Sequence, residues 1–338
     1  MSMTDATLRP KLADVALAAG VSPATASRVL TGSAPVRPQT RRDVEAAIAR
    51  LGYVRNRTRR SVPRRTGSVA FVACEDNTRV FSEPFFPSVL RSISLVLSAR
   101  GIQLVLLMAH SPRDYQMLAR YLRSGHVDGA ALVSMHGRRP LDPESLGTPI
   151  AMVGRPLDDD GEFSYVDADN VGGAQEAVRY LIKHGRSMVA TIAGPPDMSP
   201  GVDRLRGYRA AISDAGLSDR GLIVYGDFGM ASAEHAVYRL LDRRPGLDAV
   251  FAASDLMAAG ALRALRRAGR RVPDDVAVIG FDDSPLALYT EPKLTTVRQP
   301  LKEMGERVAT ELLGLIARSG QDPFQVVLDT TLVIRQST

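Results

Sequence analysis

The sequence predicts a small all-α headpiece followed by a two-lobed α/β body with doubly wound parallel sheets. Charge separates the two parts: residues 1–66 hold 13 Lys and Arg against 4 Asp and Glu, although the chain of 338 residues carries a net charge of only +6. The apolar pattern also changes, from short helical repeats to alternating strands and helices. A basic module joined to a mildly acidic body is typical of a nucleic-acid-binding domain fused to a second domain, and an arginine-rich solvated surface is the alternative.

Composition excludes several classes of protein. Apolar residues make up 45% of the chain and charged residues 24%, which is typical of globular domains and not of disordered or fibrous chains. No apolar run approaches the ~18 residues that cross a membrane, and the N-terminus lacks the apolar segment of a secretion signal. The one cysteine, Cys74, can form neither an intrachain disulfide nor a cysteine-based metal site, so a reducing cytoplasm is the expected compartment.

The basic part predicts three short helices. The apolar spacing of Leu12–Ala19 gives the first, and Gly20 can adopt the left-handed conformation that ends it. Ser22 can cap a second helix that begins at Pro23, and a third is expected over about Pro38–Arg50. Two helices joined at a glycine-containing turn form a helix-turn-helix, although such pairs also occur in ordinary helical domains.

In a helix-turn-helix, the first residues of the second helix meet base edges in the major groove. Arg28 can form two parallel hydrogen bonds to a guanine, whereas Pro23 and Ala24 can offer only apolar or shape contacts. Short hydroxyl side chains suited to phosphate oxygens stand at Ser22, Thr25 and Ser27. These residues are the first candidates for contact with DNA.

Strands and helices alternate through the body. Strands are expected at Ser68–Ala73, Gln103–Met108, Gly129–Val133, Ile150–Val153, Met188–Ile192, Ile223–Tyr225, Ala249–Ala252 and Val276–Ile279. Helical patterns lie between most of them, for example at Phe86–Arg100, Val171–His184, Asp203–Ala215, Ala231–Arg243 and Asp255–Ala268. This order predicts parallel, doubly wound sheets. The stretches Val127–Ala131 and Leu247–Phe251 resemble each other, which favours two similar lobes.

Ligands of open parallel sheets bind beyond the carboxyl ends of the strands, and two facing lobes form a cleft there. The candidates at this edge are Glu75, Asp76, Gly154, Arg155, Ser254, Asp255, Asp282 and Asp283. The five histidines show no metal-ligand spacing, and each is expected at a turn or on the surface. No nucleophile, phosphate-loop or zinc-protease motif is present, so the sequence predicts neither an enzyme nor a metal or cofactor.

Motifs along nearly the whole chain resemble those of LacI-family bacterial repressors in order and spacing. In the headpiece they are LADVA (12–16), AGVS (19–22), TASRVL (25–30), TR (40–41) and LGY (51–53). In the body they are SEPFF (82–86), VDADNVG (166–172), RLRGY (204–208), VIGFDD (278–283) and LTTVRQP (294–300). The resemblance implies a helix-turn-helix headpiece and a periplasmic-binding-protein-like effector domain.

The resemblance also implies domain boundaries. It implies a DNA-binding headpiece at 1–54, a hinge at 55–66 that folds on operator DNA, and a ligand-binding and dimerisation domain at 67–338. The first lobe is expected to hold about 67–166 and 296–322, and the second about 167–295 and 323–338. By composition alone, the hinge would be a disordered basic linker.

The family pattern adds DNA contacts outside the second helix. They are Leu12, Tyr53, Asn56, Arg57, Arg59, Arg60 and Val62. Relatives commonly place a leucine where this chain has Val62, and the leucine wedges into the minor groove. Valine is shorter and Pro63 disfavours helical geometry before it, so we expect the hinge to bind more through arginine charge than through a wedge.

For the body, the resemblance implies that Arg204 and Asp282 clamp a ligand between aromatic walls. The walls would be Phe85, Phe86 and Phe228, with Ser254 in the lining. A carboxylate accepts two hydroxyls, a guanidinium donates in a fixed fork, and aromatic faces stack on a sugar or a base. The alternatives are a surface charge for Arg204, a loop cap for Asp282 and core positions for the phenylalanines.

The function implied is a ligand-responsive, sequence-specific transcriptional regulator, most simply a repressor of a carbohydrate uptake or catabolism operon. Its expected partners are double-stranded operator DNA, a small-molecule effector such as a sugar, and a second copy of the chain. A dimer is expected and not a tetramer, because no heptad helix trails the last strand. The protein would act at the nucleoid. A solute-binding receptor or enzyme on the same scaffold, or a nucleobase-responsive regulator, are the alternatives.

Overall fold

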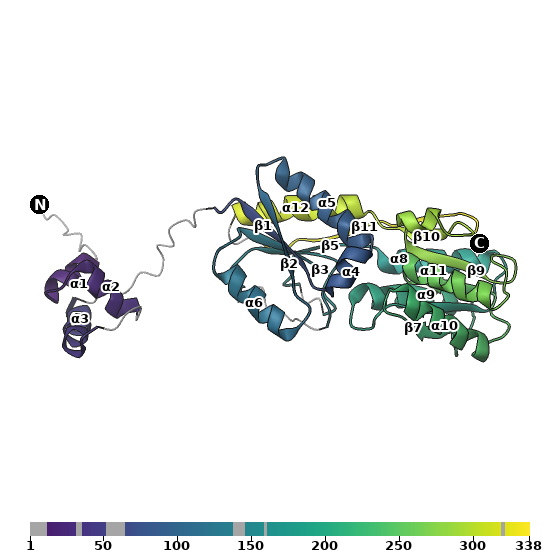
Figure 1. Cartoon of the computed structure of the whole chain (residues 1–338), viewed down its shortest axis with the longest axis horizontal. Helices are drawn as coiled ribbons and strands as arrows, with labels where there is room; N and C mark the ends of the chain where they lie inside the picture. Colours follow the sequence, from purple (N-terminus) through teal and green to yellow (C-terminus); the bar gives the residue numbers. More distant parts are fainter. Residues whose placement is uncertain (1–11, 32–35, 52–64, 138–145, 159–160, 319–321) are drawn as a thin grey trace, which may run out of the picture. The chain divides into compact units, whose positions relative to one another are not determined.

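The computed structural model describes residues 12–31, 36–51, 65–137, 146–158, 161–318 and 322–338. The chain divides into two compact units, Met1–Arg64 and Arg65–Thr338. In Figure 1 the described part of the first unit is the purple group of three helices, and every described strand lies in the second unit.

The headpiece consists of three helices around one small core. They are α1 (Leu12–Ala18), α2 (Pro23–Thr31) and α3 (Pro38–Leu51), within two residues of the expected bounds. The core is formed by the buried side chains of Val15, Ala16, Ala26, Val29, Val44 and Ala47. Since all three helices contribute, the orientation of α2 is fixed by packing on both of its neighbours.

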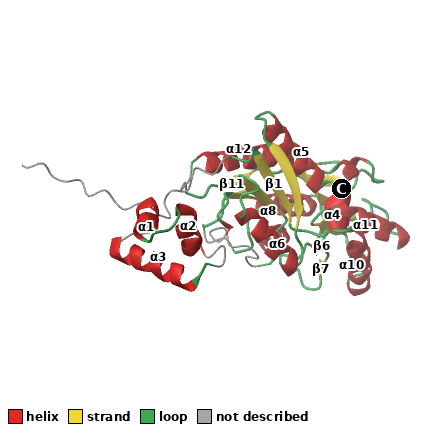
Figure 2. Ribbon diagram, turned by 60° about the vertical axis from the view of Figure 1, so that its left-hand side comes forward, coloured by secondary structure: helices red, strands yellow, loops and turns green. Residues whose placement is uncertain are grey.

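The first lobe is a six-stranded parallel sheet with the strand order β11-β5-β4-β3-β1-β2. Its strands are β1 (Ser68–Ala73), β2 (Gln103–Met108), β3 (Gly129–Val133), β4 (Ile150–Val153), β5 (Tyr165–Ala168) and β11 (Gln325–Leu328). Its helices are α4 (Asn77–Ser82), α5 (Phe85–Ser98), α6 (Pro112–Arg123) and α12 (Leu301–Ala317). Figure 2 shows α5 and α12 on one side of β1 and α6 on the other.

The second lobe repeats this plan with the strand order β12-β10-β9-β8-β6-β7. Its strands are β6 (Val189–Ala193), β7 (Ile223–Tyr225), β8 (Ala249–Ala252), β9 (Ala277–Asp282), β10 (Thr295–Arg298) and β12 (Thr331–Val333). Its helices are α8 (Asn170–Lys183), α9 (Ser199–Asp214), α10 (Met230–Arg243) and α11 (Asp255–Arg267), with a 3-10 turn at Pro285–Leu288. Strand β12 is antiparallel to β10, whereas the other pairs described in this sheet are parallel.

Two aspartates confirm the similarity of the lobes that the sequence indicates. Asp128, just before β3, accepts hydrogen bonds from the backbone N–H groups of Thr66 and Gly67 at the start of β1. Asp248, just before β8, does the same for Ser187 and Met188 at the start of β6. In each lobe the carboxylate therefore fixes the beginning of the neighbouring strand.

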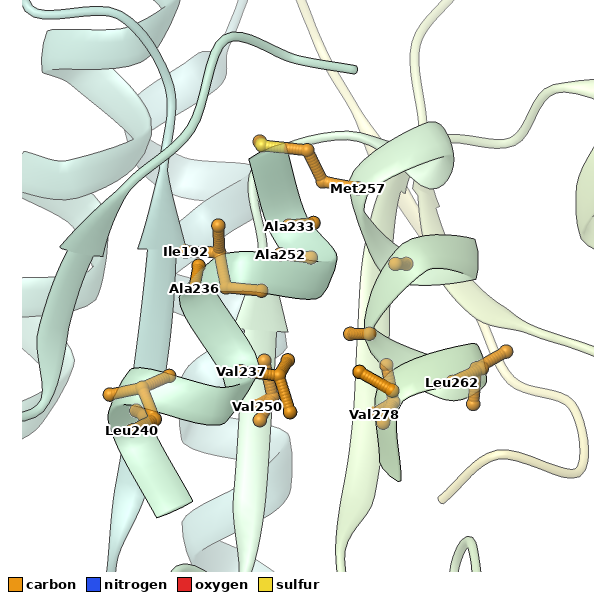
Figure 3. Close-up of a cluster of buried hydrophobic side chains, with 14 of the residues drawn as sticks. Ile192, Ala233, Ala236, Val237, Leu240, Val250, Ala252, Met257, Leu262 and Val278 are labelled. Carbon is orange, nitrogen blue, oxygen red and sulfur yellow. The ribbon is translucent and has the colours of Figure 1, made fainter. Parts of the chain in front are cut away.

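The core of each lobe lies on both faces of its sheet. In the second lobe, α10 and α11 pack over Ile192, Val250 and Val278, which project from β6, β8 and β9 (Figure 3). The opposite face carries Phe251 and Phe281 beneath α8 and α9. Each fully buried large apolar side chain contributes about 1.5–3 kcal/mol. These two layers hold the carboxyl ends of the strands in place.

The expected lobe boundaries are wrong at three points, although the two-lobed architecture is right. Strand β5 extends to Ala168 in the first sheet, and β10 belongs to the second sheet. Strand β11 pairs with β5 in the first sheet, with Gln325 opposite Tyr165, and not in the second lobe as expected. The reason is that α12 packs on the first sheet and returns the chain parallel to the otherwise open edge of β5. The chain therefore crosses between the lobes after β5, β10 and β11.

Two helical glycines, one in each lobe, test the packing of the helices. Gly207 of α9 lies so close to α8 that a Cβ there would overlap the carbonyl oxygen of Val171. Gly314 of α12 would meet nothing within 4 Å. We expect Gly207→Ala to lower the free energy of unfolding by about 1–3 kcal/mol through overpacking. Gly314→Ala should raise it by about 0.5–1 kcal/mol, because alanine loses less backbone entropy in a helix.

Chemical denaturation of the two variants beside the parent chain measures both effects. Because both helices lie in the same compact unit, they share one reference state. Equal stabilisation by the two substitutions would contradict the close contact between α8 and α9.

Candidate functional site

The turn between α1 and α2 has the geometry that the sequence predicts. Gly20 has a φ of 63°, in the left-handed region, and the N–H of Val21 bonds the carbonyl of Ala16. The hydroxyl of Ser22 accepts a hydrogen bond from the N–H of Thr25 at 3.2 Å, which caps α2. The first turn of α2 is therefore held by local hydrogen bonds as well as by the core.

The candidate DNA contacts of this turn lie on the surface of the headpiece. Ser22, Pro23, Ala24 and Arg28 are exposed, and Thr25 and Ser27 are half-buried. Leu12 is half-buried and packs against the core, so its expected contact with DNA stays a prediction. The remaining candidates, Tyr53, Asn56, Arg57, Arg59, Arg60 and Val62, lie outside the described residues.

A cavity of about 720 Å³ opens between the two lobes, at the carboxyl ends of their strands. All six residues expected to bind a ligand line it: Phe85, Phe86, Arg204, Phe228, Ser254 and Asp282. Phe85 and Phe86 come from the start of α5 in the first lobe, and the other four from the second lobe. The structure therefore gathers residues that are up to 197 positions apart in the sequence.

Arg204 is not a surface charge of α9, because its side chain is 5% exposed. Its Nε donates to Oδ1 of Asn170 at 2.9 Å, and one terminal nitrogen donates to the carbonyl of Ala253 at 2.6 Å. The guanidinium carbon lies 3.7 Å from the ring centre of Phe281, so the charged plane stacks on an aromatic face. These partners fix the orientation of the guanidinium before any ligand arrives.

Asp282 lies beside Arg204 at the end of β9. Its Oδ1 is 3.5 Å from the guanidinium nitrogen of Arg204 and accepts a hydrogen bond from Gln299 at 2.7 Å. Burial raises the pKa of Asp282, and the charge of Arg204 opposes that shift. Its φ of 122° is unusual for a residue with a side chain, which is a strained conformation of the kind often found at functional sites.

The aromatic walls differ in how much surface they offer. Phe86 is 3% exposed and belongs to the core of the first lobe, whereas Phe85 is half-buried and meets it edge to face at 5.3 Å. Phe228 has a positive φ of 69° and stands 5.6 Å from the guanidinium carbon of Arg204. Phe228 is also largely buried, at 9% exposed, and belongs to the core of the second lobe. By exposure, Phe85 is therefore the better candidate for stacking, and Phe86 is chiefly a core residue.

Two other strand-end candidates have structural partners. The hydroxyl of Ser254 donates to the carbonyl of Phe228 and accepts from the N–H of Met257, so it caps α11 and positions Phe228. Asp255 accepts from the hydroxyl of Thr296 and the N–H of Ser284. Burial and the neighbouring Asp282 raise the pKa of Asp255 to about 8.

The sequence alone did not assign roles to two groups that shape the cavity. Asn170, quoted only as part of a motif, holds Arg204 and donates to Asp167 and the carbonyl of Ala168. Arg155 reaches across the cleft and forms a bidentate pair with Asp203 at 2.6–3.0 Å. The hydroxyl of Ser199 also donates to the carbonyl of Arg155. The sequence offered one signal for each residue: Asn170 is an amide next to a predicted helix, and Arg155 follows a predicted strand.

The part of the chain that the structure describes contains no cluster of three or more His, Cys, Asp or Glu side chains that could hold a metal ion. Within the same residues, no helix is both long and apolar enough to cross a bilayer.

Comparison with known proteins agrees with both parts of the structure. Residues 11–56 match the model of bacterial regulatory proteins of the lacI family, and residues 178–338 match a periplasmic binding protein-like domain. The chain is 48% identical to the HTH-type transcriptional regulator CelR of Thermobifida fusca, over 97% of this chain and 98% of that protein. It is 31% identical to the ribose operon repressor of Halalkalibacterium halodurans, over 96% of each chain.

A solved structure of a CelR–cellobiose complex is similar along the whole chain. The TM-score is 0.78 at 46% sequence identity, covering 98% of this chain and 100% of that one. Together these matches make the chain a DNA-binding transcriptional regulator and exclude the expected alternatives of a transport receptor or an enzyme. The chain belongs to the LacI family of bacterial regulatory proteins.

Proposed function

We propose that this regulator is a repressor whose affinity for operator DNA changes when a β-linked glucose disaccharide of the cellobiose type binds between its lobes. The observation that carries the proposal is the buried guanidinium of Arg204 beside the Asp282 carboxylate, in the wall of a cavity of about 720 Å³. The target would be an operon for uptake or breakdown of that sugar.

The chemistry of the cavity suits a neutral polyhydroxy ligand. Asp282 can accept from two hydroxyl groups, and Arg204 can donate to hydroxyl or ring oxygens in a fixed geometry. The faces of Phe85 and Phe228 suit the apolar C–H surface of a pyranose ring. Because Arg204 is already held by Asn170 and Ala253, binding needs little further ordering of its side chain.

The volume of the cavity and the similarity to CelR narrow the class of ligand. The cavity lies within the range of about 300–1,000 Å³ that is typical of small-molecule sites. The solved CelR structure, which is 46% identical in sequence to this chain, is a complex with cellobiose. We infer a ligand of the same class for this chain.

Ligand binding would act on DNA through lobe closure. The effector can change operator affinity only by its differential affinity for the two lobe arrangements, and operator DNA must change effector affinity by the same factor. The three chain crossings after β5, β10 and β11 are the segments that would bend.

The headpiece would supply half of a symmetric, dimeric DNA-binding unit. One α2 offers few side chains to base edges, so we infer a homodimer that binds a near-palindromic operator with two headpieces. Such a regulator would work in the cytoplasm, on the DNA of the nucleoid. Tyr53, Asn56, Arg57, Arg59, Arg60 and Val62 would complete the interface from the hinge side.

Arg28→Ala tests the DNA interface. We expect the preference for operator over random DNA to fall about 5- to 150-fold, because a bidentate contact to guanine is worth about 1–3 kcal/mol of discrimination. Gel-shift titrations with the promoter upstream of its own gene and with a scrambled duplex measure this ratio. As a matched control, Arg42→Ala removes an exposed arginine of α3 and should change both affinities equally. An unaltered ratio in Arg28→Ala would contradict the role of Arg28.

Asp282→Asn tests the ligand site. Asparagine keeps the shape and tolerates a positive φ, but it loses the charge that strengthens hydrogen bonds to hydroxyls. We expect the Kd for cellobiose to rise about 10- to 100-fold by calorimetry, while operator binding without ligand stays unchanged.

Asp274→Asn, at an exposed ion pair with Arg271, is the matched control and should leave the Kd unchanged. Unaltered cellobiose binding by Asp282→Asn would show that the clamp lies elsewhere. Thermal stabilisation by nucleobases and not by cellobiose would overturn the sugar class; at about 100 times its Kd, a true ligand adds roughly 2.7 kcal/mol.

A further inference from the structure

One histidine joins the two lobes through both of its ring nitrogens. His136 follows β3 in the first lobe, and its Nε2 lies 2.9 Å from Oε2 of Glu75, which follows β1 of the same lobe. Its Nδ1 lies 3.0 Å from Oδ2 of Asp197, between β6 and α9 of the second lobe. His136 is half-buried, so the sequence-based placement of the histidines at turns or on the surface omits this role.

The number of protons decides whether this bridge is attractive. A neutral imidazole has one N–H donor and one lone pair, whereas an imidazolium has two donors. Because both nitrogens of His136 face carboxylate oxygens, a neutral ring would direct its lone pair at one of them. Only the protonated ring can therefore satisfy Glu75 and Asp197 together.

The surroundings keep Glu75 ionised. It is buried, which raises its pKa, but hydrogen bonds from His136 and the N–H of Asp76 and the charge of Arg79 outweigh burial and lower it. Arg79 of α4 forms an ion pair with Glu75 at 2.9 Å.

Two other groups near Glu75, Cys74 and Tyr115, keep their protons near neutral pH. Burial raises the pKa of Cys74 to about 12 and also raises that of Tyr115 in α6. Glu83, the residue after α4, forms an ion pair with Arg79 at 2.6 Å. The group facing His136 from the second lobe is Asp197, whose backbone carbonyl also accepts from the N–H of Gly137.

We propose that His136 is a proton-operated latch between the lobes, so that proton uptake favours the closed cleft and strengthens effector binding. This proposal rests on the proposed ligand function for its main readout. A second bridge across the same cleft joins Arg155 to Asp203 and contains no histidine, so it contributes to closure without His136.

The direction of the pH dependence follows from the closed structure. The hydrogen bond to Glu75 raises the pKa of His136, burial opposes it, and Asp197 adds to the rise. Glu75 lies in the same lobe as His136 and stays beside it when the cleft opens, so only the part of the pKa rise that Asp197 causes can stabilise closure. That part is fully present below the pKa of His136 in the open state. The contribution is lost as the pH rises through the raised value.

Calorimetric titration of the full chain with cellobiose, from about pH 6 to pH 8.5, tests the latch. The Kd of the parent chain should rise with pH, with a slope of log Kd that approaches but does not exceed about one per pH unit. Buffers of different ionisation enthalpy should show net proton uptake on binding. A parent chain with a flat profile and no proton uptake would overturn the proposal.

Three variants locate the effect. Asp197→Asn removes the charge that faces His136 from the second lobe, so its Kd for cellobiose should depend less steeply on pH than that of the parent chain. His136→Gln should also have a smaller slope, with weaker binding at low pH. His235→Gln, at an exposed histidine of α10, is the matched control and should keep the parent slope. A parent-like slope in His136→Gln would assign the proton to another group.

A second measurement is independent of the ligand. Spin labels at Arg120→Cys in α6 and Arg239→Cys in α10 report the distance between the lobes, and the buried Cys74 should not be labelled. Without ligand, we expect the short-distance population to decrease as the pH rises, and not to change in His136→Gln. If cellobiose binds at no pH, the proposed effector is wrong, yet this population still tests the latch. A population that does not respond to pH in the parent chain would contradict the latch itself.

Discussion

The buried guanidinium of Arg204 is the interaction on which the arrangement of the second lobe depends. A charge removed from water must be met by hydrogen bonds and opposite charge, or it is strongly destabilising. Here the partners come from separate parts of the chain: Asn170 at the start of α8, Ala253 after β8, and Asp282 at the end of β9. Phe281 supports the guanidinium plane from below. Each partner must be placed by its own strand or helix, so the site and the core of this lobe are specified together.

The same constraint links the site to conformational change. Arg204 and Asp282 belong to the second lobe, whereas Phe85 and Met135 line the cavity from the first. A ligand that contacts both walls favours closure by the difference between its affinities for the closed and open states. Two polar contacts, Arg155 with Asp203 and His136 with Asp197, already cross the cleft in this structure.

Much of the fold could be predicted because its signals are local. Apolar runs rich in strand-forming residues predicted eight of the twelve described strands to within three residues. The glycine turn with its serine cap predicted the helix-turn-helix. The start of α9 was missed by four residues, because Pro200 and Gly201 weaken the helical pattern there. The placement of β11 was wrong, because pairing with β5 is a contact over 160 residues that no local pattern contains.

The candidate site shows the same division. Asp282, Arg155 and Glu75 could be found as polar residues just after predicted strands, and Arg204 only through the family resemblance. The partners of these residues could not be found from the sequence. Asn170, Gln299 and His136 act through hydrogen bonds to residues that are distant in the chain. Phe86 was expected to be a wall of the ligand site, but it lies beside the cavity and belongs chiefly to the core.

A crystal structure of the protein with bound cellobiose tests the central claim most directly. The account predicts the sugar between the lobes, with hydroxyl groups at about 2.7–3.2 Å from the guanidinium of Arg204 and the carboxylate of Asp282. Arg204 should keep its hydrogen bonds to Asn170 and Ala253, because it is ordered before binding. A sugar bound outside the cleft, or within it but without contact to Arg204 and Asp282, would contradict the account.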